Sequence, residues 1–172
     1  MVYENDWILL REDRVVTPSG SEGLYSFVEV NPVAAVLPLT ADLSIYLVGQ
    51  YRYPLDMYSW EIPEGTIKNG EPLEECARRE LLEEIGLSAK KWTRLGSFHT
   101  GNSLTNEVGH IYLAEDLSQG TAKPDHTEKL EIKKIPFMES YKMVLKGEIK
   151  DALTVIGIYR AYYDLQQAGR LR

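Results

Sequence analysis

The sequence has a single cysteine, Cys76, among 172 residues. One thiol permits neither an intramolecular disulfide nor a thiolate metal cluster, so we expect Cys76 to be a buried, unreactive side chain. The sequence also lacks an apolar run long enough to cross a bilayer, and its charged first residues lack the apolar stretch of a secretory signal. These absences favour a cytoplasmic protein that makes no membrane contact.

Basic residues are in the minority: 19 Lys and Arg stand against 26 Asp and Glu, for a net charge of −7 and a pI of about 5.1. An acidic surface argues against a nucleic-acid partner. It does not exclude a phosphorylated small molecule, because a bound metal ion reverses the local charge. The length and an apolar fraction of 44% predict a single domain, 1–172, with a sizeable core.

Neither repeats nor low-complexity segments interrupt the chain, and apolar periodicity predicts its elements. The expected strands form a hairpin at 7–30 and a second, more buried pair at 31–53, with further strands at 59–63, 92–100, 109–117 and 130–137. The expected helices lie at 71–85, 138–147 and 151–167. In the last helix, we expect Leu153, Ile156, Tyr159 and Tyr163 on the core side. Strands and helices that do not alternate regularly favour an α+β fold with helices packed on a mixed sheet.

The helix at 71–85 gathers Glu80, Glu83 and Glu84 on one side. At about 100° per residue, Glu84 lies roughly 40° and Glu83 roughly −60° from Glu80. Like charges this close cost roughly 0.2–0.5 kcal/mol per pair. The cluster is either a solvated charged face or a site for a hard divalent cation, Mg²⁺ or Mn²⁺, which carboxylate oxygens bind well.

The spacing of this segment resembles the Nudix box at every specified position. The matching residues are Gly65, Glu71, Arg79-Glu80-Leu81, Glu83-Glu84 and Gly86-Leu87. The resemblance implies the Nudix fold, a mixed β-sheet sandwiched between α-helices, and metal-dependent hydrolysis of a diphosphate.

The same resemblance implies roles for individual residues. Glu80 and Glu84 are the expected metal ligands, and the carbonyl of Glu64 is a further candidate. Glu83 is expected to be a ligand or to orient or activate water, and Arg79 to hold a neighbouring carboxylate. Gly65 lets the backbone approach the site closely, while Glu71 braces the loop.

The segment before the box resembles that of ADP-ribose and nucleotide-sugar pyrophosphatases, through Gln50-Tyr51-Arg52 and Glu61-Ile62-Pro63 followed by Gly65. Arg52 is a candidate for bidentate phosphate contact, and Glu61 for accepting hydrogen bonds from a ribose or base. Either residue has the alternative of an ordinary surface or loop position. Four aromatic side chains either stack on a base or pack in the fold: Tyr51, Tyr53, Tyr58 and Trp60.

Two loops after the box bear on the substrate and the base. Asn102 and Ser103 stand where ADP-ribose pyrophosphatases commonly carry a proline. This difference favours a nucleoside diphosphate sugar hydrolase with a broader substrate range. Glu107 matches an acid that is frequent in that subfamily. In the loop 118–129, Glu128 is expected to supply a metal ligand or general base. His126 is either a second base or an exposed loop residue. His99 and His110 are expected to be structural.

The predicted reaction releases a nucleoside monophosphate and a sugar phosphate. Alternatives are another Nudix substrate (a dinucleoside polyphosphate, coenzyme A or a capped RNA) and a non-catalytic Nudix nucleotide sensor; the intact box favours catalysis. The subfamily is usually a homodimer, and the resemblance implies that the N-terminal strands, within about 1–40, cross to the partner.

Overall fold

A computed structural model of the chain describes residues 1–120 and 130–171. The strands are β1 (Tyr3–Glu4), β2 (Ile8–Val16), β3 (Glu22–Val30), β4 (Val33–Pro38), β5 (Ser44–Arg52), β6 (Met57–Glu61), β7 (Glu64–Thr66), β8 (Leu87–His99), β9 (Val108–Gln119) and β10 (Glu131–Pro136). The helices are a 3₁₀ turn, η1 (Tyr53–Leu55), and α1 (Leu73–Ile85), α2 (Phe137–Leu145) and α3 (Ala152–Gln167). Within the described residues, no helix combines the length and apolar character that a bilayer crossing needs.

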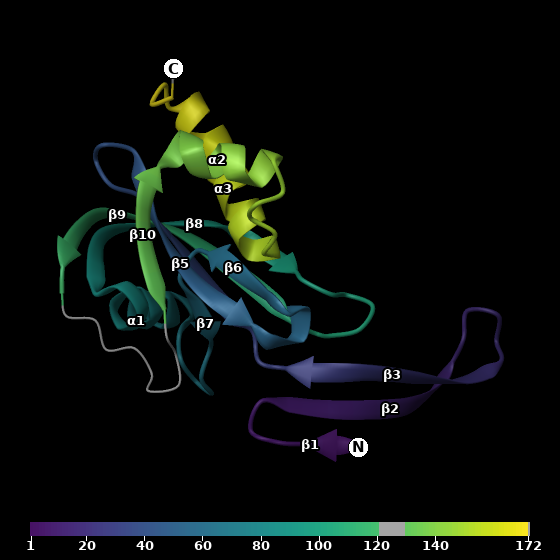
Figure 1. Cartoon of the computed structure of the whole chain (residues 1–172). Coiled ribbons are helices and arrows are strands. Elements are labelled where there is room, and N and C mark those ends of the chain that lie inside the picture. Colours follow the sequence, from purple (N-terminus) through teal and green to yellow (C-terminus); the bar gives the residue numbers. More distant parts are fainter. Residues whose placement is uncertain (121–129, 172) are drawn as a thin grey trace.

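The first three strands form an arm that projects from the body of the molecule (Figure 1). β2 and β3 pair antiparallel along their whole length, which confirms the hairpin predicted at 7–30. The arm meets the body where the Val28 N–H donates to the Leu104 carbonyl and the Tyr25 hydroxyl donates to the Ser103 carbonyl, each over 2.8 Å. No residue of these three strands is buried, so the arm contributes little to the core.

The strands of the body form two sheets in the described part of the chain. One has the order β7-β4-β9-β8, with β4 and β9 parallel, and the other has the order β10-β5-β6. The predicted pairing of 31–40 with 44–53 is therefore wrong, since β4 and β5 lie in different sheets and a single bridge, Leu39↔Ile45, connects their ends. β4 is almost wholly buried and takes a parallel partner, as strands covered on both faces commonly do.

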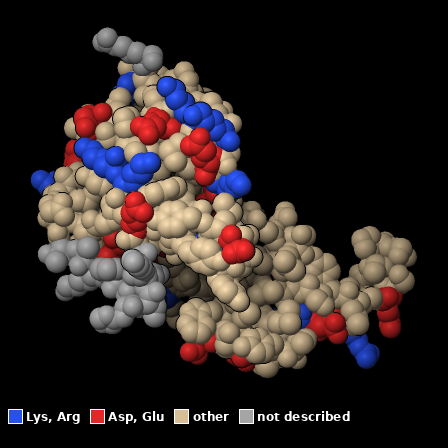
Figure 2. All heavy atoms as spheres, viewed as in Figure 1, with Lys and Arg blue, Asp and Glu red and all other residues tan. Residues whose placement is uncertain are grey.

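Helices cover the two sheets from opposite sides (Figure 1). Ala34 and Val36 of β4 pack in the cluster that includes α1, whereas Ala35 and Leu37 pack in the cluster that includes α2 and α3. This alternation follows from the two-residue period of a strand. The α+β sandwich is thus confirmed, with the strands divided between two sheets rather than joined in one. Figure 2 shows basic and acidic residues interspersed over the visible face of the body.

Helix α1 begins at Leu73, after Pro72, two residues later than predicted. Its end is as predicted, because Gly86 takes a left-handed conformation at φ 68° that stops the helix. β8 follows at once at Leu87, so the strand predicted at 92–100 is longer than its sequence pattern indicated.

The buried face of α3 differs from the predicted one. Tyr159 and Tyr163 are exposed, so their assignment to the core is wrong, whereas Leu153 is buried and Ile156 is partly buried. The core side instead carries Thr154, Gly157, Ile158, Ala161 and Leu165. Gly157 allows close packing here, since a Cβ would lie 3.3 Å from the side chains of Ile111, on β9, and Ile62, between β6 and β7. The tyrosine hydroxyls remain in water, which avoids burying a polar group without a partner.

Candidate active site

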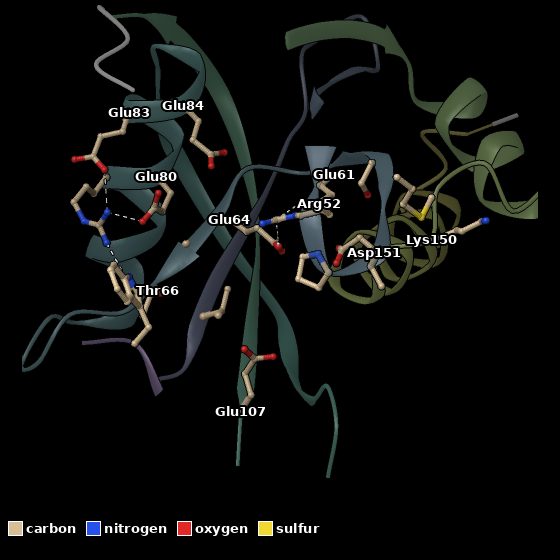
Figure 3. Close-up of a pocket in the computed structure, with 18 of the residues that line it drawn as sticks. Arg52, Glu61, Glu64, Thr66, Glu80, Glu83, Glu84, Glu107, Lys150 and Asp151 are labelled. Carbon is tan, nitrogen blue, oxygen red and sulfur yellow. Dashed lines mark hydrogen bonds and ion pairs between the residues drawn. The ribbon is translucent and has the colours of Figure 1, made fainter. Parts of the chain in front are cut away.

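A cleft of about 1030 Å³ lies between α1 and the start of α3 (Figure 3). Its lining comes from the arm, β4, the β5–β6 turn, β6, β7, α1, the loop before β9 and the start of α3. The lining residues are Trp7, Val33, Arg52, Pro54, Leu55, Met57, Ser59, Glu61, Glu64, Gly65, Thr66, Lys68, Arg79, Glu80, Glu83, Glu84, Glu107, Lys150 and Asp151. Most of the predicted site residues are therefore brought together.

The carboxylates of α1 form one wall of this cleft. Glu80 and Glu84 are buried, while Glu83 is more exposed. Gly65, on β7, passes so close to α1 that a Cβ there would lie 2.0 Å from the Glu80 Oε1 atom. Any larger residue at position 65 would therefore displace the Glu80 carboxylate from its position.

Arg79 holds three of the neighbouring carboxylates. Its guanidinium donates to Glu71 Oε1 over 2.8 Å and to Glu83 Oε2 over 2.9 Å, and it also contacts Glu80. The predicted bracing role of Glu71 fits its position, since it also accepts from the Lys68 N–H over 2.9 Å. Hydrogen bonds from Arg79 lower the pKa of Glu71 to about 2.

The second group in the cleft joins Arg52 to two acids. Arg52 forms a bidentate ion pair with Glu61, with 2.9 Å between Nε and Oε1, and its Nη2 lies 3.3 Å from Glu64 Oε1. Arg52 and Glu61, predicted to contact substrate, are thus engaged with one another. The Glu64 Oε2 atom is buried and has no hydrogen-bond partner among the described residues. Burial raises the pKa of Glu64 well above its usual value, and the nearby Asp151 adds to the rise.

Ten lining residues were not predicted at the site from the sequence, and three of these carry groups that bear on its chemistry. Trp7 reaches the cleft from the arm, and Lys150 and Asp151 reach it from the start of α3. Asp151 caps α3 by accepting from the Thr154 N–H over 2.7 Å, and an Asp before an apolar helix is a recognisable cap signal. That signal gives the position of a helix end but not its neighbours in space.

Other predicted residues lie in the cleft but away from the α1 wall, or outside the cleft altogether. Glu107 lines the cleft at some distance from the other labelled acids and accepts from Thr100 (Figure 3). The candidate stacking residues Tyr51, Tyr53, Tyr58 and Trp60 do not line this cleft. His110 contacts Ser97 Oγ over 2.8 Å on the sheet, which fits a structural role. His126 and Glu128 lie outside the described residues.

A divalent cation matches this wall in donor chemistry, but the wall is not a preassembled coordination sphere. The α1 wall offers carboxylate oxygens, the donors that Mg²⁺ and Mn²⁺ prefer, and the buried Glu64 Oε2 is a further oxygen near them. In the arrangement described, no three Asp, Glu, His or Cys groups within 1–120 and 130–171 converge on a common point. Arg79 occupies the positions between Glu80 and Glu83, so cation binding requires these side chains to rearrange.

Comparison with known proteins defines the class of this chain. Residues 30–153 match the NUDIX domain, and residues 1–28 match the nucleoside diphosphate sugar hydrolase N-terminal domain. The chain belongs to the Nudix family of hydrolases, which confirms the resemblance drawn from the 65–87 spacing. Nudix hydrolases generally need a divalent metal ion.

Individual relatives align over nearly the whole chain. An ADP-ribose pyrophosphatase of Bacillus subtilis (strain 168) is 33% identical over 169 residues, 97% of this chain and 90% of that protein. A methanol dehydrogenase activator of Bacillus methanolicus is 31% identical over the same shares. Among solved structures, an ADP compounds hydrolase has a TM-score of 0.87 and 22% identity, and covers 99% of this chain and 92% of that chain, which supports the same fold.

Proposed function

We propose that the protein hydrolyses the diphosphate bond of a nucleoside diphosphate sugar, with Mg²⁺ or Mn²⁺ as its cofactor. The observation that carries the proposal is the placement of a complete Nudix box on one wall of a cleft, with Glu80 and Glu84 buried against it. Carboxylates grouped on one helix face repel one another. A divalent ion bound there would offset this repulsion and would also bind the substrate diphosphate.

Each residue of the wall has a role in this scheme. Glu80, Glu84 and the carbonyl of Glu64 hold the cation, and Gly65 leaves room for it. When bound, the cation neutralises charge on the diphosphate oxygens and makes water a better nucleophile. Glu83, released from Arg79, orients or deprotonates the attacking water, and Glu128 is the alternative base.

Arg79 and Arg52 serve different purposes in this proposal. Arg79 holds the acids and offsets their charge before the cation arrives, through its hydrogen bonds to Glu71 and Glu83. Arg52 is held by Glu61 in a fixed orientation beside the cleft, and its remaining donors face a diphosphate. Glu61 thus positions Arg52, in addition to its proposed contact with a ribose or base. A base also has a hydrophobic surface to lie on, since Trp7 is 75% exposed and lines the cleft.

The substrate class is supported by two independent lines. Residues 1–28 match the N-terminal domain of nucleoside diphosphate sugar hydrolases, and a relative over 97% of the chain is named ADP-ribose pyrophosphatase. Asn102 and Ser103 favour a range of sugars over ADP-ribose alone. Glu107 and His126 stay candidates for substrate contact.

We also propose a homodimer formed through the arm, in a cytoplasmic protein. The arm exposes large apolar side chains: Val2, Tyr3, Trp7, Val16, Leu24 and Tyr25. A second copy would cover such a surface, since large exposed apolar patches mark sites of protein association. Light scattering coupled to gel filtration tests this state, and a monomer at micromolar concentration contradicts it.

One substrate panel tests the reaction. ADP-ribose, ADP-glucose, GDP-mannose, UDP-glucose, diadenosine polyphosphate and coenzyme A are incubated with Mg²⁺ or Mn²⁺, and released monophosphate is measured. We expect turnover of at least one nucleotide sugar, which chelation by EDTA abolishes. Turnover of only the last two compounds contradicts the proposed substrate class, and no turnover of any compound favours a nucleotide sensor.

A further inference from the structure

The wall of the cleft opposite α1 is built around Asp151. One of its oxygens, Oδ2, accepts from the Thr154 N–H over 2.7 Å, which fixes the carboxylate at the start of α3. The Thr154 hydroxyl in turn accepts from the Ile62 N–H over 2.9 Å, and Thr154 is fully buried. Asp151 therefore belongs to the same rigid frame as Glu61 and Glu64 on either side of Ile62.

Two acid groups face one another across this part of the cleft. Asp151 points toward Glu64 and Arg52 (Figure 3). Glu64 Oε2 is buried without a hydrogen-bond partner among the described residues, and Asp151 uses Oδ2 to cap α3. Lys150 also lines the cleft, but its side chain runs away from Glu64 and Arg52 (Figure 3). The wall thus presents carboxylate acceptors that a ligand can use.

This combination suits hydroxyl groups rather than phosphates. A hydroxyl donates a hydrogen bond, so neighbouring hydroxyl groups of a sugar can satisfy the two carboxylates. A phosphate offers only acceptors at neutral pH and would be repelled by two neighbouring carboxylates. The α1 wall and Arg52 account for the diphosphate, which leaves the Asp151 side of the cleft for the group attached to it.

We propose that Asp151, with Glu64, binds the hydroxyl groups of the sugar and selects neutral, polyhydroxylated groups on the diphosphate. This inference rests on the proposed function and assigns one wall of the same cleft to the sugar. Asp151 is then a specificity-determining residue that touches substrate, in addition to capping α3.

The test compares two substrates that differ only in the sugar. The first is the nucleotide sugar that the wild-type protein hydrolyses fastest. The second is the methyl ester of the same nucleoside diphosphate, which keeps the nucleoside ribose but lacks the hydroxyls of the terminal sugar. The variants are Asp151→Ser and Asp151→Asn. Ser and Asn are both good helix caps, so they preserve the start of α3, and thermal unfolding checks that they do.

We expect Asp151→Ser to lower kcat/KM for the nucleotide sugar by about 10- to 100-fold, the range for losing hydrogen bonds to a charged group. For the methyl ester, kcat/KM should change by less than about threefold, since this substrate has no terminal sugar for Asp151 to contact. For the nucleotide sugar, the kcat/KM of Asp151→Asn should lie between that of the wild type and that of Asp151→Ser.

The outcomes separate this inference from the proposed function. Equal losses on both substrates, or no loss on either, overturn the inference and leave the hydrolase proposal intact. A wild-type protein that hydrolyses no nucleotide sugar contradicts the proposed function itself, and the inference with it.

Discussion

Replacing Arg79 with Gln should destabilise the protein in a way that a divalent cation reverses. Arg79 is 20% exposed and bridges Glu71, Glu80 and Glu83. Without its charge, these carboxylates repel one another on a partly buried face. Gln keeps part of the side-chain length and can still donate one or two neutral hydrogen bonds, so the change mainly removes charge.

The size of the effect follows from the exposure of the network. Breaking a fully buried ion pair costs about 3–5 kcal/mol, whereas an exposed pair contributes about 0–1 kcal/mol. Arg79 lies between these limits, with partners that are 15%, 11% and 39% exposed. We therefore expect a loss of about 2 kcal/mol in EDTA, or a Tm lower by about 4–8 °C for a chain of this length.

Magnesium should recover much of this loss. A site with a dissociation constant of about 1 mM gives about 1.4 kcal/mol of stabilisation at 10 mM ion. The gain should be larger in Arg79→Gln than in the wild type, because the acids are no longer held by the guanidinium. Tm is measured by calorimetry with EDTA and with 10 mM Mg²⁺.

Arg78→Gln is the matched control. Arg78 is the neighbouring residue on the same helix, but it pairs with Glu74 and stacks on Trp92 away from the cleft, with the guanidinium 4.7 Å from the ring centre. Its Mg²⁺ increment should equal that of the wild type. Two results refute the reasoning that the cation and Arg79 offset the charge of the same acids. One is an equal rise in Tm with Mg²⁺ for Arg79→Gln and Arg78→Gln, and the other is an unchanged Tm for Arg79→Gln in EDTA.

Three further predictions address the same wall. Glu84→Gln keeps the side-chain shape but removes a cation ligand, so kcat should fall by about 100-fold or more while Tm stays within a few degrees; retained turnover contradicts the assignment. The pKa of Glu71 is lowered to about 2. The Glu71 carboxylate therefore contributes fully to stability above its unfolded pKa of about 4.3, and this contribution is lost as the pH falls toward 2. Urea unfolding at pH 6, 4 and 3 should show that the free energy of unfolding declines more steeply for the wild type than for Glu71→Gln. Gly65→Ala places a Cβ 2.0 Å from Glu80 Oε1, so the Mg²⁺ concentration for half-maximal activity should rise about tenfold or more. Gly101→Ala is the control, since its Cβ would meet only Thr105 Oγ1 at 3.6 Å, and it should leave that concentration unchanged.

The α1 wall could be predicted from the sequence because its geometry is local. Residues three and four apart on a helix share a face, so the spacing of Glu80, Glu83 and Glu84 gives their arrangement directly. Gly86 stops the helix through its own backbone conformation, φ 68°, which needs no distant contact. The resemblance to the Nudix box added Gly65, whose close approach to Glu80 the structure shows.

The opposite wall could not be predicted because it depends on packing between distant segments. Asp151 is 87 residues from Glu64 along the chain, and only the docking of α3 onto the β6–β7 connection brings them together. Arg52 and Glu61 were each predicted at the site, but their mutual pairing depends on the β5–β6 register. The separation of β4 and β5 into two sheets likewise follows from partners later in the chain.

The hydrogen bond from the Ile62 N–H to the Thr154 hydroxyl has a consequence for biosynthesis. During translation, the segment with the acidic helix leaves the ribosome well before α3 does. A nascent chain at that stage carries the carboxylates but has no partner for the buried Ile62 amide, and β4 still awaits β9. The Nudix box is thus complete early, while a closed cleft forms only once the C-terminal helix has been made and docked.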